Sequence, residues 1–301
     1  MGGIVTYLKE GLPGKPSYRV EDVPDMSGKV IFITGGNSGI GFEIAKVCVF
    51  LSRNAQVYIA SRSQERTMEA INKLKEETGK EALFIQLDVA DLKSVRKAAD
   101  ETLSGVMNTP NGQVTVDGYD YQFGTNVIGH YLLTKRLLPL LRAAAQSSPD
   151  GKARIISSSS SAIHFTNKLS LDEMKDVAAL KKLGSPEMYM QSKLANLVLS
   201  NEFARRYIDE GIVSVAVNPG NIMTGLSRHT PKLAVLMLRW LNYSVKYGIL
   251  TGLYAGTTPE AGKLNGKYLI PWAVEGKMHP AAANSELGKR LWDWLDNETK
   301  D

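Results

Sequence analysis

The chain has 301 residues, of which 43% are hydrophobic and 22% charged, and its formal net charge is +5. This length and composition favour one α/β domain with a single large core, and the basic residues alternate with acidic ones, which argues against nucleic acid as a partner. The one cysteine, Cys48, lies in an apolar helical pattern, so it allows no disulfide within the chain and no cysteine-based metal site. His130 and His164 have no further ligands at a suitable spacing, and no metal is expected.

The N-terminus lacks the apolar run of a signal peptide, and no stretch has the length of a transmembrane helix. We therefore expect a cytoplasmic protein. Gly2 and Thr6 match the N-myristoylation pattern M-G-x-x-x-[ST], which often occurs by chance, so membrane association stays an alternative.

A leader of residues 1–28, which contains Pro and Gly, precedes a single domain that we expect to span residues 29–301. Short apolar runs predict strands at 29–34, 56–61, 82–89, 153–157, 212–220 and 267–271. Helical periodicity predicts helices through 44–51 and at 66–79, 92–103, 117–145, 189–207 and 286–298. The alternation predicts a parallel sheet with crossover helices.

The alternation fails once, at the stretch ETLSGVMNTPNG, residues 101–112. It joins one helical pattern to the next where a strand is due. The preceding residues KSVRKAADET are polar and favour a helix, so they suit a buried strand poorly. We expect an irregular segment here.

The stretch TGGNSGIG, Thr34–Gly41, lies between a buried strand and a helix start. Glycines at 35, 39 and 41 let the backbone turn tightly and approach a pyrophosphate, and the helix N-terminus offers free N–H groups. An ordinary Gly-rich turn is the alternative, but the strand–turn–helix context favours a dinucleotide site.

The second strand ends in Ser61 and Arg62, where an NAD-selecting site normally has an acidic residue. A guanidinium can pair with a 2′-phosphate, so the sequence favours NADP(H) over NAD(H). The alternative is a surface arginine at the end of a strand.

Tyr189 and Lys193 are four residues apart in YMQSK and share one helix face. The ammonium would favour the ionised phenol, so the tyrosine could act as an acid or base near neutral pH. A packed tyrosine beside an extended lysine is the structural alternative.

Together these motifs resemble the short-chain dehydrogenase/reductase family over nearly the whole chain. The stretches ARIIS, QFGTNVIGHYLLTK and GKYLIPWA are most similar to retinol-dehydrogenase-like members, including fungal ones. The resemblance implies a Rossmann-like, doubly wound parallel sheet. It also implies that Asp88 and Val89 contact the adenine and that Asn126 holds a water molecule of the proton relay. The nicotinamide side would be lined by Pro219, Gly220, Ile222 and Thr224. The other expected cofactor contacts are Gly35, Asn37, Ser38, Gly39, Ile40, Gly41, Arg62, Tyr189 and Lys193.

The catalytic serine should come from the run of serines at 157–161. Alignment from Arg154 with the family pattern R-I-V-N-V-S-S places it at Ser160, while Ser159 and Ser161 stay open because identical neighbours blur the register. In the implied mechanism Tyr189 transfers the proton, Lys193 lowers the pKa of Tyr189 and binds the nicotinamide ribose, and Ser160 binds the substrate oxygen.

The segment Leu226–Gly256 is rich in Leu, Met, Trp and Tyr. It is expected to be a lid over a small lipophilic carbonyl or alcohol substrate, with a buried helix pair or a homodimer face as alternatives.

By the same resemblance, a fourth strand ending in N-N-A-G is missing, and about a dozen residues are absent before Gly105. The loss would leave backbone groups of both neighbouring strands unpaired, at roughly 1–3 kcal/mol each if they stay unsatisfied. An NADP(H)-dependent oxidoreductase is favoured. The alternatives are a non-catalytic NADP-binding or scaffold protein, or a splice or gene-model variant that is inactive because of the deletion near Ser104 and Gly105.

Overall fold

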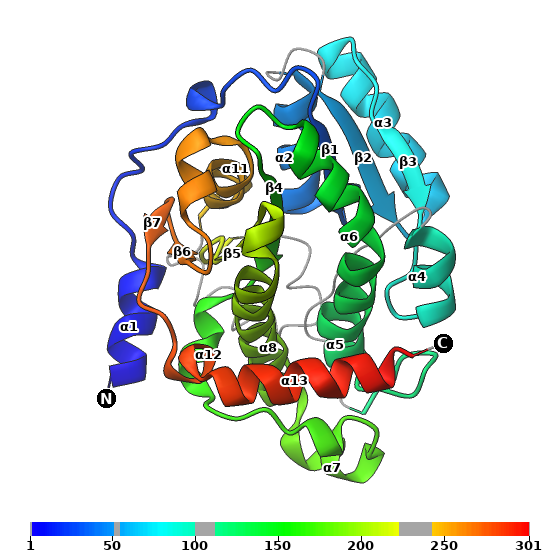
Figure 1. The fold of residues 1–301 in the computed structure, drawn as a ribbon, viewed down its shortest axis with the longest axis vertical. Coiled ribbons are helices and arrows are strands. Elements are labelled where there is room, and N and C mark those ends of the chain that lie inside the picture. Colours follow the sequence, from blue (N-terminus) through cyan, green and yellow to red (C-terminus); the bar gives the residue numbers. More distant parts are fainter. Residues whose placement is uncertain (1, 51–54, 100–111, 223–242, 301) are drawn as a thin grey trace.

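A computed structural model describes residues 2–50, 55–99, 112–222 and 243–300. Within these ranges the chain is an α/β protein in which helices pack around two sheets (Figure 1). The strands are β1 (Val30–Thr34), β2 (Gln56–Ser61), β3 (Leu83–Gln86), β4 (Ala153–Ser158), β5 (Ile212–Val217), β6 (Tyr268–Ile270) and β7 (Val274–Glu275). The helices are α1 (Gly2–Gly11), α2 (Gly39–Phe50), α3 (Gln64–Thr78), α4 (Leu92–Ala99), α5 (Tyr121–Phe123), α6 (His130–Ser147), α7 (Val177–Leu183), α8 (Ser185–Tyr207), α10 (Val245–Gly248), α11 (Leu250–Thr257), α12 (Pro280–Ala283) and α13 (Ser285–Glu298).

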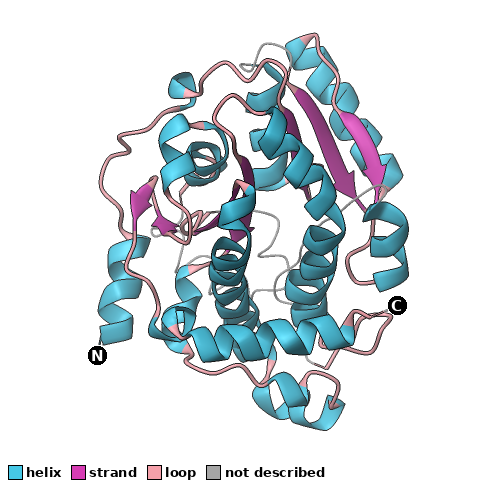
Figure 2. Ribbon diagram, in the orientation of Figure 1, coloured by secondary structure: helices cyan, strands magenta, loops and turns pink. Residues whose placement is uncertain are grey.

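The sheet is divided where the sequence predicts a missing strand. One sheet has the parallel order β1-β2-β3, and the other has the order β4-β5-β6-β7, parallel except for β7 (Figure 2). In the described residues no strand pairs with the free edge of β1 or of β4. Every residue of β5 is buried, but β1 and β4 have one buried residue each, as expected for edge strands. Among the described residues the sheet is therefore divided at this point, and the predicted irregular segment lies almost wholly in residues 100–111, outside the description.

Two helical segments connect the divided sheets. Helix α6 packs against α4 on the side of the first sheet and against β4 of the second. Helices α10 and α11 pack against α2 and against β4, β5 and β6. Ile249, Leu250 and Leu253 of this segment belong to the same apolar cluster as Ile59 of β2. Packing of side chains thus joins the two halves where backbone pairing is interrupted.

The described half of the proposed lid segment, residues 243–256, forms α10 and α11. In residues 243–256 the apolar side chains Ile249, Leu250 and Leu253 are at most 5% exposed. In this half of the segment Leu226–Gly256, α11 is largely buried, whereas Lys246 and Tyr247 of α10 are exposed, so the lid and the buried helix pair both stay predictions. Residues 226–242 lie outside the described part of the chain.

Local sequence signals explain both boundaries of α3. Helix α3 begins after Ser63, whose side chain accepts a hydrogen bond from the Arg66 amide (3.3 Å), and ends at Gly79, which has a φ of +71°. Its buried residues Thr67, Ala70, Ile71 and Leu74 recur at intervals of three and four. The α-helix predicted at 117–145 is instead interrupted: a π-helical turn, η2 (Gly124–Gly129), separates α5 from α6. Such turns often occur at functional sites.

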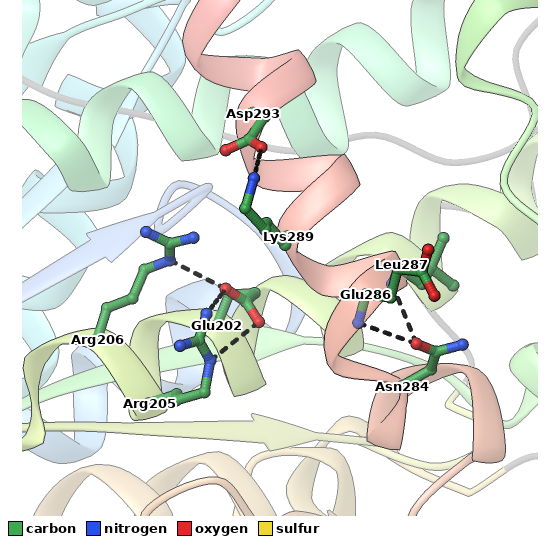
Figure 3. Close-up of polar contacts among 8 residues, drawn as sticks. All are labelled: Glu202, Arg205, Arg206, Asn284, Glu286, Leu287, Lys289 and Asp293. Carbon is green, nitrogen blue, oxygen red and sulfur yellow. Dashed lines mark hydrogen bonds and ion pairs between the residues drawn. The ribbon is translucent and has the colours of Figure 1, made fainter.

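The C-terminal helix α13 lies across α8 (Figure 1). The Glu202 carboxylate of α8 is 3% exposed and pairs with Arg205 (2.6 Å) and Arg206 (2.9 Å), as Figure 3 shows. A Cβ at Gly288 of α13 would lie 2.5 Å from Glu202 Oε1, so a larger residue there would require the Glu202 side chain to shift. The contact fixes α8, which carries Tyr189 and Lys193.

The leader is part of the folded domain. Residues 2–11 form α1, which the sequence analysis did not predict, and it packs against the 3₁₀-helix η3 (Ser161–Phe165). Tyr18 is 7% exposed, and its hydroxyl lies 3.3 Å from Thr257 Oγ1 of α11. A boundary at residue 28 therefore does not separate a loose leader from the domain.

Candidate active site

The Gly-rich loop connects β1 to α2 as predicted. Gly35 has a φ of +66° and its N–H donates to Ala60 O (2.9 Å), while Gly39 has a φ of +58° and begins α2. A Cβ at Gly41 would lie 2.5 Å from Gly35 O. The loop therefore needs glycine at these positions, and it leaves the first N–H groups of α2, beside Asn37, Ser38 and Ile40, available for an anion. The cradle fits a dinucleotide pyrophosphate.

Arg62 follows β2 at the carboxyl edge of the first sheet. The parallel register aligns Ser61 with β3, and the Leu87 amide donates to Ser61 O (3.0 Å). The Arg62 side chain is exposed, and Nη1 donates to the Tyr121 hydroxyl (3.2 Å). The guanidinium thus lies at the same edge as the Gly-rich loop and is accessible to a 2′-phosphate.

Asp88 and Val89 follow β3 at this edge but differ in accessibility. The Asp88 carboxylate accepts a hydrogen bond from the Ala90 amide (2.9 Å), and its own backbone N–H donates to Ser94 Oγ (3.0 Å). Val89 is 3% exposed, and a Cβ at Gly129 would lie 2.4 Å from its carbonyl oxygen. The Val89 side chain is therefore part of the core, and only its backbone could meet an adenine.

The serine run ends β4, and the structure distinguishes its members. Ser159 is 2% exposed, and its hydroxyl donates to Lys193 O (2.9 Å). Ser161 is 3% exposed at the start of η3. Ser160 is half-buried, and its side chain hydrogen-bonds with Tyr189. Of the three candidates, this geometry favours Ser160.

Tyr189 and Lys193 lie one turn apart on α8. Lys193 Nζ is 5.7 Å from the centroid of the Tyr189 ring and donates to Ser158 O (3.3 Å). Burial raises the pKa of Tyr189, and its hydrogen bond with Ser160 partly opposes this. Burial also lowers the pKa of Lys193 to about 8. The net effect on Tyr189 is the opposite of the lowered pKa expected from the lysine, because desolvation dominates.

Asn126 lies in the π-helical turn and reaches α8 indirectly. Its Nδ2 donates to Ser192 Oγ (3.1 Å), and the Ser192 hydroxyl donates to Tyr189 O (2.8 Å). His130 follows the turn, and its Nδ1 is 2.8 Å from Thr125 O. Burial lowers the pKa of His130 to about 4, and the charge of Lys193 acts in the same direction, so His130 is neutral at pH 7. Ser192 was not identified from the sequence, because its contact with Asn126 is tertiary, and His130 was considered there only as a metal ligand.

The loop after β5 contains the remaining residues that were predicted to contact the cofactor. Asn218 Oδ1 accepts from the Gly220 amide (2.9 Å), and Gly220 has a φ of +86°. Ile222 forms a parallel bridge with Tyr243. The loop also contains Pro219, and Thr224 lies outside the described residues.

Asn126 lies in η2, Tyr189 and Lys193 lie on α8, and the other predicted site residues follow strands of one sheet or the other. The Gly-rich loop, Arg62 and Asp88 belong to the first sheet, and Ser160 and the loop after β5 belong to the second.

In the described residues no group of three or more His, Cys, Asp or Glu side chains could hold a metal ion. The helices described include none that is long and apolar enough to cross a membrane.

Comparisons with known proteins identify the family. A sequence profile described as short chain dehydrogenase matches residues 29–169. A short-chain dehydrogenase/reductase from Armillaria gallica is 46% identical over 313 aligned positions, which cover 100% of both chains. The chain therefore belongs to the short-chain dehydrogenase/reductase family of oxidoreductases. Because the chain has 301 residues, about a dozen of the 313 aligned positions have no counterpart in it.

Solved structures share the fold. An uncharacterized protein from Mycobacterium paratuberculosis is 25% identical with a TM-score of 0.73, covering 94% of this chain and 98% of its own. The NADPH-bound carbonyl reductase from chicken fatty liver is 23% identical with a TM-score of 0.59, covering 81% and 96%. The Rossmann-like α/β fold is thus confirmed.

Proposed function

We propose that the chain is an NADP(H)-dependent oxidoreductase that transfers a hydride between nicotinamide and a lipophilic carbonyl or alcohol. The observation that carries the proposal is the contact of Ser160 with Tyr189, with the Lys193 ammonium one helical turn away. Tyr189 can exchange a proton, and the Lys193 ammonium polarises its hydroxyl, in a site that is partly buried. The nicotinamide, when bound, supplies the hydride chemistry.

Tyr189 acts as the proton donor to a substrate oxygen. Because burial raises its pKa, the phenol holds its proton at neutral pH and can donate it to the oxygen of a carbonyl substrate. The Ser160 hydroxyl donates a hydrogen bond to the same oxygen as negative charge develops on it. Lys193, charged below pH about 8, stabilises the phenolate that remains and holds the nicotinamide ribose. Asn126 supports this helix turn through Ser192.

The preference for NADP(H) rests on Arg62, which is exposed at the end of β2. The carbonyl reductase that shares the fold binds NADPH, which is consistent with this preference. The lipophilic substrate rests on the apolar sequence of residues 226–242, and the retinol-dehydrogenase-like assignment rests on the resemblance of the motifs.

The test is turnover by the 301-residue chain and by Tyr189→Phe with NADPH and a panel of lipophilic aldehydes and ketones. We expect NADPH oxidation by the wild type, a loss of roughly 10²–10⁴-fold in the Phe variant, and equal NADPH affinity in both. An active Phe variant would overturn the role of Tyr189.

The divided sheet favours one alternative, a protein that binds cofactor without turnover. NADPH binding with no turnover of any substrate in the panel would support that alternative. Transcript sequencing across the codons for Leu103 to Val106 would show whether the deletion belongs to the natural protein.

A further inference from the structure

Glu10, in the last turn of α1, is a carboxylate buried to 2% exposure. Burying a charge is costly unless hydrogen bonds compensate for the lost water. Glu10 has three such contacts: Oε1 is 2.7 Å from His164 Nε2, and Oε2 accepts from Asn218 Nδ2 (2.8 Å) and from the Tyr268 hydroxyl (3.1 Å). So complete a set of partners indicates a specific docking contact.

The partners of Glu10 come from three segments around the proposed active site. His164 lies in η3, which begins directly after Ser160. Asn218 is the first residue after β5 and begins the loop of residues 218–222, which we call the nicotinamide-side loop because the family resemblance implies that it lines the nicotinamide. Tyr268 begins β6, which pairs with β5. One carboxylate thus connects α1 to the serine segment, the loop and the second sheet.

The Asn218 amide transmits this contact to the loop. Its Nδ2 donates to Glu10, and its Oδ1 accepts from the Gly220 N–H (2.9 Å). The carboxylate can only accept, so it fixes which end of the amide faces Gly220. Without Glu10 the amide could rotate and release the Gly220 N–H.

The fit of α1 against η3 is close. A Cβ at Gly3 would lie 2.5 Å from His164 O, and the rings of Tyr7 and Phe165 pack with centroids 5.0 Å apart. In Figure 1, α1 lies beside the end of the second sheet that holds β6 and β7. The helix is therefore held by shape as well as by the Glu10 carboxylate.

We propose that Glu10 is a positioning residue that holds the nicotinamide-side loop through Asn218, so that α1 completes this end of the cofactor site. The functional part of this inference rests on the proposed NADP(H) function. The structural part, the hold on Gly220, does not.

Hydrogen exchange of the unliganded chain tests the structural part. In Glu10→Ala, the Gly220 amide should exchange on the order of tenfold faster, since one buried hydrogen-bond chain is broken. Amides of β5, such as that of Val215, should be unchanged. Glu10→Gln keeps an acceptor for Asn218 and should restore protection. Glu76→Gln makes the same change at an exposed position of α3 and serves as the control.

Gly3→Ala provides a second variant that leaves the carboxylate in place. The added methyl group must push α1 away from His164 O, so faster exchange at Gly220 is expected here also. This variant tests the docking of α1 even if Glu10→Ala does not fold. Unchanged exchange at Gly220 in every folded variant, or equal acceleration in β5, would overturn the inference.

Ligand binding tests the functional part. Glu10→Ala should weaken NADPH binding on the order of tenfold, whereas 2′,5′-ADP, which has no nicotinamide, should bind as it does to the wild type. Equal weakening of both would mean general destabilisation and contradict the positioning role. If the wild type binds neither NADPH nor 2′,5′-ADP, and the Gly220 amide still exchanges faster in Glu10→Ala, the proposed function is refuted. The structural part of the inference, that Glu10 holds the loop through Asn218, would then stand.

Discussion

Replacing Lys193 by Met should make the cofactor-free chain more stable while removing its activity. Burial lowers the pKa of Lys193 from its ordinary value of 10.5 to about 8, which corresponds to about 3 kcal/mol of penalty on the charged form. The side chain is partly exposed, so solvent screening reduces this penalty, and the bond from Nζ to Ser158 O offsets about 1 kcal/mol of it. A net gain of about 1–2 kcal/mol is expected, or about 2–4 °C in Tm.

The pH dependence of this gain has a definite sign. Below pH about 8 the lysine is charged in the folded and unfolded states, so the folded wild type bears the whole penalty. Between pH about 8 and 10.5 the folded state loses its proton first, and the wild type gains stability as pH rises. The difference between Lys193→Met and the wild type should therefore be largest at neutral pH and shrink towards pH 10.

Thermal unfolding of both chains without cofactor, at several pH values between 7 and 10, is the assay. Lys93→Met, at an exposed position of α4, is the control and should show no such trend. If Lys193→Met unfolds at a lower temperature than the wild type at pH 7, the desolvation argument is wrong.

Three further substitutions test single parts of the site. Arg62→Ala should weaken NADPH binding by about 10–100-fold and leave NADH binding nearly unchanged, as titrations with each would show. Gly41→Ala should weaken cofactor binding by about tenfold or more, since its Cβ would lie 2.5 Å from Gly35 O; wild-type affinity in a titration would refute the cradle. In steady-state kinetics, Ser160→Ala should lower kcat by roughly 10²–10³-fold and Ser159→Ala by much less, and the reverse order would move the catalytic role to Ser159.

The elements with strong local signals were predictable from the sequence. The run QVYIAS has the bounds of β2, and α3 ends at Gly79 as its C-terminal glycine predicts. The division of the sheet was also predictable, because a strand needs an apolar run and the stretch at residues 101–112 has none. In each of these cases the deciding information is contained within about a dozen neighbouring residues.

Elements that depend on tertiary contacts were not predictable. Helix α1 contains glycines that weaken a helix locally, and Gly3 is explained only by the close approach of His164. The burial of α11 follows from packing against β4, β5 and β6 rather than from its own pattern. Similarly, an isolated sequence of five serines could not show that Ser159 faces the Lys193 carbonyl while Ser160 faces Tyr189.

The same limit applies to protonation. The spacing of Tyr189 and Lys193 correctly predicts that they share a helix face, but the direction of the tyrosine pKa depends on how much water reaches the phenol. Burial is a property of the folded chain, and here it outweighs the neighbouring charge.

The central claim is that the chain forms a working NADP(H) site although the sheet is divided between its two halves. Calorimetric titration of the 301-residue chain with NADPH, and separately with NADH, tests it most directly. We expect saturable NADPH binding that is clearly tighter than NADH binding. A folded, soluble chain that binds neither would contradict it, and the retained motifs would then describe the activity of the family and not of this chain.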